Sequence, residues 1–218
     1  PKEAAIIMIT RDGYIKRLAE DTFKQQRRGG KGIIGLTAKE EDSVDQLFST
    51  NTHANILFFT SRGRVFQLKA YEVPAASRTA KGQAVVNFLQ LSPEEKVTSA
   101  LSCDDIKSSG YKFLVMVTSN GTIKKTKLDA FENVRRSGLI AITLKGKDAL
   151  EWVKPSTGND QVILATDNGQ SIRFKESDVR DMGRTAGGVR GIKLRPNDSV
   201  VGMDIVSQSA LKNAELCI

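Results

Sequence analysis

The sequence predicts an all-β chain of repeated, four-stranded units. The first reason is a recurring apolar run followed by Thr, two residues and Gly, and the second is its regular spacing. The four turn glycines of these segments lie 50, 58 and 48 residues apart. The third reason is that long amphipathic helices are not evident between them. The four segments are residues 6–13, 56–63, 114–121 and 162–169.

Each unit is expected to open with a β-hairpin. Asp-Gly or Asn-Gly at the tip favours a tight turn with positive φ. The apolar arm is continuous rather than alternating, as in a strand that is covered on both faces. In the return arm the fourth residue after the glycine is polar, which predicts a recurrent outward position. These residues are Arg17, Gln67, Lys125 and Arg173.

Further strands are expected between the hairpins, at about four short strands per roughly 50 residues, as in a propeller blade. The strand-like runs are residues 44–49, 82–88, 96–102, 139–144, 151–153, 191–194 and 199–206. We therefore expect a single domain over 1–218, with blade repeats beginning near residues 5, 55, 112, 161 and 215. Residues 215–218 resemble the start of another apolar arm, so the chain is expected to be a fragment that stops inside a fifth unit.

Residues 26–32, Gln-Arg-Arg-Gly-Gly-Lys-Gly, form the most distinctive stretch of the chain. Three cations share seven residues with three glycines, and glycine lets a polyanion approach backbone N–H groups. Counting fifteen residues past each turn glycine gives arginine in all four units: Arg28, Arg78, Arg136 and Arg184. With 33 lysines and arginines in 218 residues, chance does not readily produce this recurrence. The pattern predicts one basic loop per unit.

The composition narrows the classes of function. A net charge of +8 points to nucleic acid or another anionic surface. No run reaches the roughly 18 apolar residues of a membrane span, and the N-terminal residues do not read as a signal peptide. Two isolated cysteines predict neither a disulfide framework nor a zinc site. We expect a cytoplasmic protein without a membrane partner.

Catalysis by this chain alone is not expected. The Gly-Gly-Lys-Gly run lacks the Ser or Thr that follows lysine in a phosphate-binding loop. His53 is the only histidine, and the Asp104-Asp105 pair has no accompanying His or Cys, so neither a catalytic nor a metal site is predicted. Tyr14 is expected to pack or to lie at the edge of bound DNA, as are the two other tyrosines.

With these residues assembled, the chain resembles the C-terminal domain of bacterial DNA gyrase A. Residues 26–32 match the basic box of that family, and residues 13–17, Gly-Tyr-Ile-Lys-Arg, resemble the hairpin before it. The resemblance implies a β-pinwheel, a propeller-like array of four-stranded antiparallel blades with DNA wrapped around a basic perimeter. About six blades are usual in the family, so this chain would cover four and begin another. The second to fourth boxes depart from the family pattern.

The function that this resemblance implies is sequence-independent binding, bending and wrapping of duplex DNA, in support of negative supercoiling by the ATP-dependent topoisomerase. The catalytic groups, the ATP and the Mg²⁺ would lie outside this chain, which needs no cofactor of its own. The expected protein partners are the N-terminal portion of the same gyrase A polypeptide and gyrase B, and the isolated domain is expected to be a monomer. Two alternatives stay open, a propeller-type protein-interaction module and the equivalent domain of topoisomerase IV.

The residues expected to bind DNA are the first box and the cations of the other hairpins and boxes. They are Gln26, Arg27, Arg28, Gly29, Gly30, Lys31, Gly32, Lys16, Arg17, Arg78, Lys81, Lys125, Arg135, Arg136, Arg173, Arg184 and Arg190. Bending about 40 bp through half a circle costs on the order of 10 kcal/mol. One box cannot supply that free energy, so wrapping requires boxes on several blades.

Overall fold

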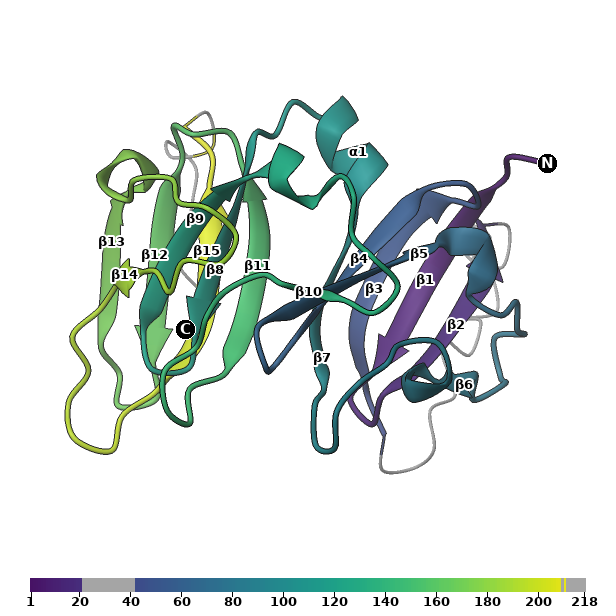
Figure 1. Cartoon of the computed structure of the whole chain (residues 1–218), viewed down its shortest axis with the longest axis horizontal. Coiled ribbons are helices and arrows are strands. Elements are labelled where there is room, and N and C mark those ends of the chain that lie inside the picture. Colours follow the sequence, from purple (N-terminus) through teal and green to yellow (C-terminus); the bar gives the residue numbers. More distant parts are fainter. Residues whose placement is uncertain (21–41, 209, 211–218) are drawn as a thin grey trace, which may run out of the picture.

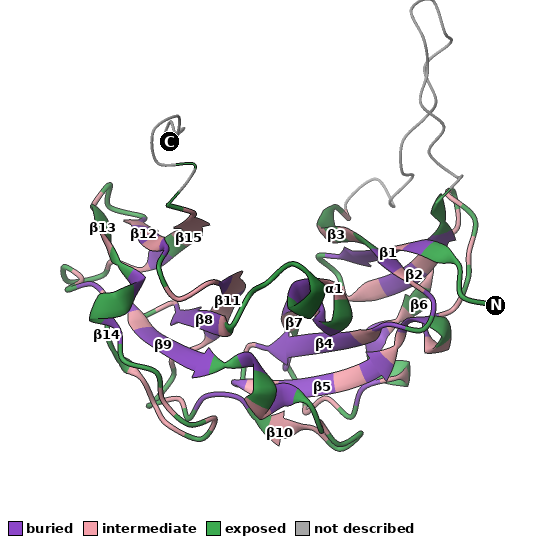
Figure 2. Ribbon diagram, turned by 90° about the horizontal axis from the view of Figure 1, so that it is seen from above, coloured by how far each residue is buried: buried purple, intermediate pink, exposed green. Residues whose placement is uncertain are grey.

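The computed structural model describes residues 1–20, 42–208 and 210, and these form four antiparallel sheets (Figure 1). The first three sheets have four strands each, in the orders β3-β1-β2-β6, β10-β5-β4-β7 and β11-β8-β9-β14. The fourth has three described strands, β13-β12-β15. Seen from above, the sheets follow one another along an arc (Figure 2). The prediction of an all-β, propeller-like fold is confirmed.

The strand bounds follow the repeat closely. In chain order they are β1 (Ala4–Thr10), β2 (Tyr14–Ala19), β3 (Val44–Asn51), β4 (Asn55–Thr60), β5 (Arg64–Lys69), β6 (Gln83–Ala84), β7 (Val97–Ser102), β8 (Phe113–Thr118), β9 (Thr122–Lys127), β10 (Leu139–Ile140), β11 (Leu150–Ser156), β12 (Gln161–Thr166), β13 (Ser171–Lys175), β14 (Val189–Arg190) and β15 (Val200–Val206). The described helical segments are short: α1 (Cys103–Ser108) and single 3₁₀ turns such as η4 (Leu128–Phe131).

The Thr-x-x-Gly motif is explained by the hairpin turn. Each threonine hydroxyl accepts a hydrogen bond from the backbone N–H of the residue after the turn glycine. The N–O distances are 3.1 Å at Thr10, 3.2 Å at Thr60, 3.1 Å at Thr118 and 3.1 Å at Thr166. The glycine itself has a φ between 73° and 83° in the four turns, a conformation that disfavours other residues. Threonine and glycine together therefore define the start of each return strand.

The continuous apolar strands are explained by the stacking of sheets. Phe58 and Phe59 on β4 point to opposite faces, and both are fully buried. Phe58 packs with Ile7 of the first sheet, whereas Phe59 packs with Met116 of the third. A third cluster joins the third and fourth sheets in the same way. Interior sheets are therefore covered on both faces, and their first strands cannot alternate between apolar and polar residues.

The outermost strand of each complete sheet comes from the following repeat. The short strands β6, β10 and β14 pair with β2, β5 and β9. Just after each short strand, a backbone N–H donates to the carbonyl of the preceding sheet's turn glycine. These bonds are Val85 N to Gly13 O at 2.9 Å, Ala141 N to Gly63 O at 2.8 Å and Gly191 N to Gly121 O at 2.8 Å. Each complete sheet therefore contains three strands of one sequence repeat and a short fourth strand of the next. This shared strand links neighbouring repeats.

Several strand predictions needed correction at these outer positions. In each of the expected runs 82–88 and 139–144, only two residues form a strand. The chain turns into η3 (Val85–Asn87) after β6, and it bends after β10. The run 191–194 is not a strand, since pairing with β9 ends at Arg190. The repeat expected near residue 215 lies outside the described residues.

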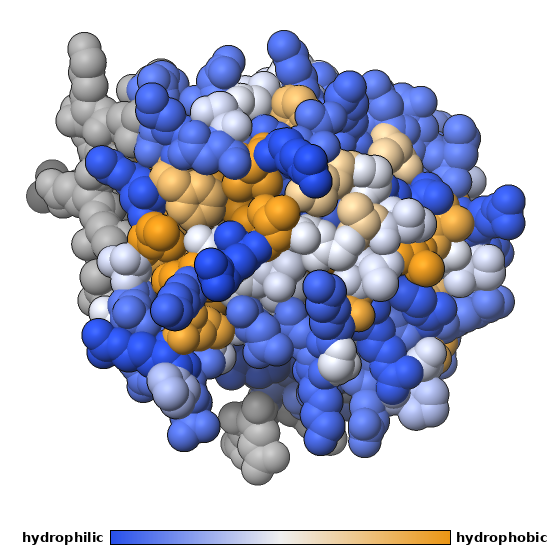
Figure 3. Space-filling model, turned by 60° about the vertical axis from the view of Figure 1, so that its left-hand side comes forward, coloured by the Kyte–Doolittle hydropathy of each residue, from blue (hydrophilic) through white to orange (hydrophobic). Residues whose placement is uncertain are grey.

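Among the described residues, the fourth sheet has exposed apolar side chains on both of its edge strands. Ile172 of β13 is 38% exposed, and Val201 of β15 is 54% exposed. Figure 3 brings this side of the molecule forward and shows an apolar patch among mostly hydrophilic side chains.

Substitution of Gly138, just before β10, tests the interlocking of repeats. Gly138 has a φ of 81°, and an added Cβ would lie 2.7 Å from the ring of Phe66 on β5 of the preceding repeat. Left-handed backbone costs roughly 1–2 kcal/mol for other residues, and overpacking adds about 1–3 kcal/mol. Gly138→Ala should therefore lower the free energy of unfolding, measured in urea, by about 2–5 kcal/mol.

Gly146→Ala is the matched control, because Gly146 has a φ of 60° but nothing within 4 Å of its added Cβ. Its free energy of unfolding should fall only by the cost of the left-handed backbone, roughly 1–2 kcal/mol. Equal losses in the two variants would contradict close packing of Gly138 on Phe66.

Candidate nucleic-acid interface

The short outer strands place the basic loops on the convex side of the arc (Figure 2). Each loop runs up to one of these strands: residues 74–82 before β6, 132–138 before β10 and 180–188 before β14. The most distinctive stretch, residues 26–32, lies outside the described residues. Gln26, Arg27, Arg28, Gly29, Gly30, Lys31 and Gly32 therefore stay sequence predictions.

The second and fourth loops dock on the preceding sheet in the same way. Arg17 N donates to Pro74 O at 2.9 Å, and Ala76 N donates to Arg17 O at 3.0 Å. In the third sheet Met182 N donates to Lys125 O at 2.8 Å. Parallel bridges join Arg17 to Ala75 and Lys125 to Asp181. Two of the four positions that the repeat predicted as outward, Arg17 and Lys125, are thus covered by the incoming loop.

The buried positions of Lys16 and Lys125 do not fit the direct contact with DNA expected of them. Lys16 is fully buried, and Lys125 is 6% exposed. The Lys125 ammonium donates to Glu176 O at 3.1 Å and lies 3.9 Å from the Glu176 carboxylate. Arg17 is half-buried, and its Nε donates to Val73 O at 3.2 Å. The side chains of Arg17 and Lys125 thus bind the backbone just before the second and fourth loops.

Arg78 and Arg184 occupy equivalent, half-buried positions. The Nε of each is buried without a hydrogen-bond partner among the described residues. A second nitrogen of Arg184, Nη1, donates to Ala130 O at 3.2 Å. The expectation of four equally presented arginines therefore does not describe these two, which the fold partly encloses.

The third loop differs because it is two residues shorter. Gly82 and Gly188 each lie 19 residues after their turn glycine, whereas Gly138 lies 17 after Gly121. Arg136 is consequently not at the structural position of Arg78 and Arg184. Arg135 and Arg136 are both exposed, and the Arg136 guanidinium forms an ion pair with Glu72 of the second sheet.

Lys81, Arg173 and Arg190 are the other exposed residues among those expected cations that the structure describes. The Lys81 ammonium lies 3.6 Å from the centroid of the Tyr14 ring, a cation–π contact between the second loop and the first hairpin. Arg173 lies on β13 and Arg190 on β14. The exposed set is thus distributed over the second, third and fourth repeats.

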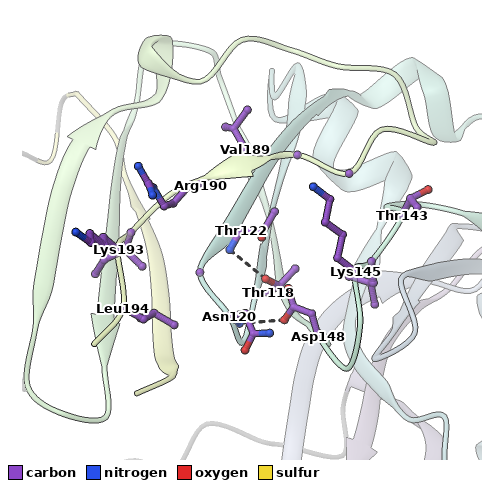
Figure 4. Close-up of a pocket in the computed structure, with 15 residues that line it drawn as sticks. Thr118, Asn120, Thr122, Thr143, Lys145, Asp148, Val189, Arg190, Lys193 and Leu194 are labelled. Atoms are coloured by element: carbon purple, nitrogen blue, oxygen red, sulfur yellow. Dashed lines mark hydrogen bonds between the residues drawn. The ribbon is translucent and has the colours of Figure 1, made fainter. Parts of the chain in front are cut away.

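A pocket of about 420 Å³ lies where the fourth loop meets the turn of the third hairpin (Figure 4). Lys145 borders it on one side, and Arg190 and Lys193 border it on the other (Figure 4). Gly187 and Gly188 add exposed backbone to the wall. Asp148 also lines the pocket, but its Oδ1 accepts hydrogen bonds from Asn120 N and Ala149 N, so the cations and glycine backbone can receive a phosphate oxygen.

Sequence reasoning missed Lys145 and Lys193. Both are exposed, and each lies nine residues after an arginine at the fifteen-residue offset, Arg136 or Arg184. Extending the comparison of repeats past the boxes could have found them.

Arg64, at the tip of the second hairpin, is neutralised by a buried carboxylate. Its Nη2 lies 2.5 Å from Oε2 of Glu95, whose side chain is fully buried. Burial raises the pKa of Glu95, but hydrogen bonds from Arg64, Thr60 and the Ser92 N–H outweigh it and lower the pKa to about 2. Arg64 therefore contributes to the stability of this sheet more than to a cationic surface.

Comparison with known proteins was made for the whole chain. The family model described as the DNA gyrase C-terminal domain, beta-propeller, matches residues 4–51, 54–104, 112–157 and 160–207. DNA gyrase A of Clostridium acetobutylicum is 49% identical over 190 residues, which is 87% of this chain and 23% of that protein. The chain thus spans about a quarter of the length of the curated relatives it matches.

Two solved structures are similar to this fold. The crystal structure of the C-terminal domain of DNA topoisomerase IV has a TM-score of 0.79 and 27% identity, with 95% of this chain and 62% of that one covered. The structure of a DNA gyrase A C-terminal domain has a TM-score of 0.68 and 26% identity, with 92% and 64% covered.

The Glu95–Arg64 pair predicts an acid-sensitive contribution to stability. Because the pKa of Glu95 lies below its ordinary 4.5, its contribution is present above pH 4.5 and is lost as pH falls toward 2. The loss should be on the order of 2–3 kcal/mol. Arg64→Met should raise the pKa of Glu95, as followed by NMR titration, and flatten this part of the pH–stability profile. An unchanged pKa of Glu95 in the variant would be inconsistent with this role.

Proposed function

Because the chain belongs to the DNA gyrase C-terminal domain family, we propose that it binds duplex DNA on the convex side of its arc and bends it. The observation that carries this proposal is the position of the second, third and fourth basic loops. Each is attached to an outer strand, and the exposed Lys81, Arg135 and Arg190 lie in or beside them. Residues 26–32, with three cations, would bind DNA in the same way.

Binding would be driven by phosphate contacts. A duplex carries one charge per about 1.7 Å of axis, and cations that neutralise phosphates release condensed counterions. Arginine can hold two phosphate oxygens at once with its planar fork. Phosphate contacts carry no base information, so the proposed binding is sequence-independent and prefers only DNA that bends easily.

Bending requires several loops. The curvature cost of about 10 kcal/mol for half a turn exceeds what one loop supplies at about 1.5–3 kcal/mol per hydrogen bond to a charged group. Loops spaced along an arc can share this cost. The pocket beside Lys145 adds a further place for a phosphate between the third and fourth repeats.

In the parent protein we propose that this wrapping supports negative supercoiling by DNA gyrase. The N-terminal portion of the same gyrase A polypeptide and gyrase B would be its partners, and the catalytic groups, ATP and Mg²⁺ would belong to those parts. The cytoplasm is the proposed location. The match of residues 26–32 to the gyrase box favours gyrase over topoisomerase IV.

The first test combines affinity and bending. The chain should bind a linear duplex of random sequence with an affinity that falls steeply with salt, and should shorten the end-to-end distance measured by energy transfer. Replacing Arg27, Arg28 and Lys31 with alanine should reduce the slope of log affinity against log salt by about 2–3. Bending should fall more than affinity, because the other loops keep their attraction.

The matched control removes three exposed cations that lie at strand ends opposite the hairpin turns: Lys2, Lys112 and Lys175. Its alanine variant should bend DNA nearly as the wild type does. A wild-type chain that leaves the duplex straight, or equal effects of the two triple variants, would contradict the proposal.

A second test increases the available charge. Glu72→Gln releases Arg136 from its ion pair while keeping an acceptor for Lys69 N, which donates to Glu72 Oε2 at 2.8 Å. Because exposed pairs are weak, the expected gain in DNA affinity is about two- to fivefold, with a steeper salt dependence.

The control for this test is Asp204→Asn, which frees Lys154 between the strands β11 and β15 on the other side of the sheets. It should change DNA affinity little. A gain with Asp204→Asn and none with Glu72→Gln would place the binding surface elsewhere.

A further inference from the structure

Two buried lysines lie beneath the longer basic loops. Lys16 on β2 and Lys124 on β9 are each the third residue after a turn glycine, and both are fully buried. Among the described residues, neither forms an ion pair with a carboxylate. A buried ammonium without a counter-ion is costly, so its position calls for a specific role.

Both ammonium groups are held by backbone carbonyls of the loop from the next repeat. Lys16 Nζ donates to Ser77 O at 3.3 Å, to Arg78 O at 2.7 Å and to Ala80 O at 2.7 Å.

Lys124 makes the equivalent contacts in the third sheet. Its Nζ donates to Arg184 O, to Ala186 O at 3.2 Å and to Ala141 O at 2.6 Å. Arg184 and Ala186 correspond to Arg78 and Ala80, since each pair lies 15 and 17 residues after its turn glycine. Three donors of Lys16 and two of Lys124 thus bind the loop that carries the arginine, and the third donor of Lys124 binds Ala141 O just after β10.

The second sheet shows what happens without a lysine. The equivalent residue there is Phe66, and the loop above it is the one that is two residues shorter. Gly138 of that loop lies directly on the Phe66 ring. The longer loops have lysine beneath them and the shorter loop has phenylalanine, so the supporting residue and the loop length vary together.

We propose that Lys16 and Lys124 are positioning residues for DNA binding, whose ammonium groups set the shape of the second and fourth basic loops without contacting DNA. This inference rests on the proposed function. Each ammonium gathers two or three loop carbonyls on the buried side of the loop, which leaves its outward side to the remaining N–H groups and to cations such as Lys81.

The environment of Lys124 agrees with this geometry. Burial and the nearby Arg184 guanidinium lower the pKa of Lys124 to about 8, and burial lowers the pKa of Lys16. With a pKa of about 8, Lys124 remains mainly protonated at neutral pH, with all three donors present.

The test is a double-mutant cycle on DNA affinity. Lys16→Met removes the donors and the charge but keeps an unbranched side chain of similar length. The double variant Arg78→Ala, Lys81→Ala removes the cations of the loop above it. Each should lower the affinity for a random duplex at about 0.1 M salt by about tenfold. Combining them should lower it little further, because both act through the same loop.

Val162→Ala in the core of the third and fourth sheets is the control for stability alone. With folding verified by circular dichroism, this variant should be less stable to urea yet bind DNA as the wild type does. Lys124→Met should repeat the result for the fourth loop, with Arg184→Ala, Arg190→Ala as its partner.

Wild-type DNA affinity in folded Lys16→Met, or a loss that simply adds to that of the loop variant, would overturn the positioning role. So would failure of both methionine variants to fold, since the lysines would then be general determinants of stability. If the wild-type chain itself does not bind DNA, the proposed function fails first, and the two failures are therefore distinguishable.

Discussion

The exchange of a two-residue outer strand between neighbouring repeats is the constraint on which the rest of the structure depends. Such a strand is too short to be stable alone, but two kinds of contact hold it on the preceding sheet. Its backbone pairs with the preceding sheet, and the next N–H donates to the turn-glycine carbonyl of that sheet. The basic loop just before the strand is therefore fixed relative to two repeats at once. This is how a local sequence repeat becomes a row of loops along the convex side.

Two kinds of cation result from this arrangement. Cations that follow the turn glycine closely, such as Lys16 and Lys125, are covered by the incoming loop and bond to backbone or carboxylate groups. Cations on the loop itself, such as Lys81 and Arg135, remain exposed. The buried cations thus order the loops, and the exposed cations are available to bind a polyanion. Affinity and loop shape are separable properties for this reason.

Much of the fold could be predicted from the sequence because its signals are local. The hairpin turn depends on threonine and glycine three residues apart, and burial on both faces removes alternation from strands such as β4. The short outer strands could not be assigned correctly, since two residues carry little propensity and their pairing is with another repeat. β14 therefore begins two residues before the run 191–194 that composition favoured.

The candidate site was harder to predict than the fold. A count from the turn glycine aligns Arg136 with Arg78 and Arg184, yet the loop before Gly138 is two residues shorter and shifts Arg136. Burial of Lys16 depends on contacts with residues 77–80, more than 60 positions away, which no local pattern reveals. Residues 26–32, the strongest sequence signal, lie outside the described part of the chain.

Hydrogen–deuterium exchange of the chain with and without duplex DNA tests the central claim most directly. We predict that DNA protects the described loops 74–82, 132–138 and 180–188 together, along with the peptide that contains residues 26–32. The inner strands β3, β7, β11 and β15 should exchange as in the free chain. Protection of the inner strands instead, with unchanged exchange in the loops, would contradict DNA binding on the convex side.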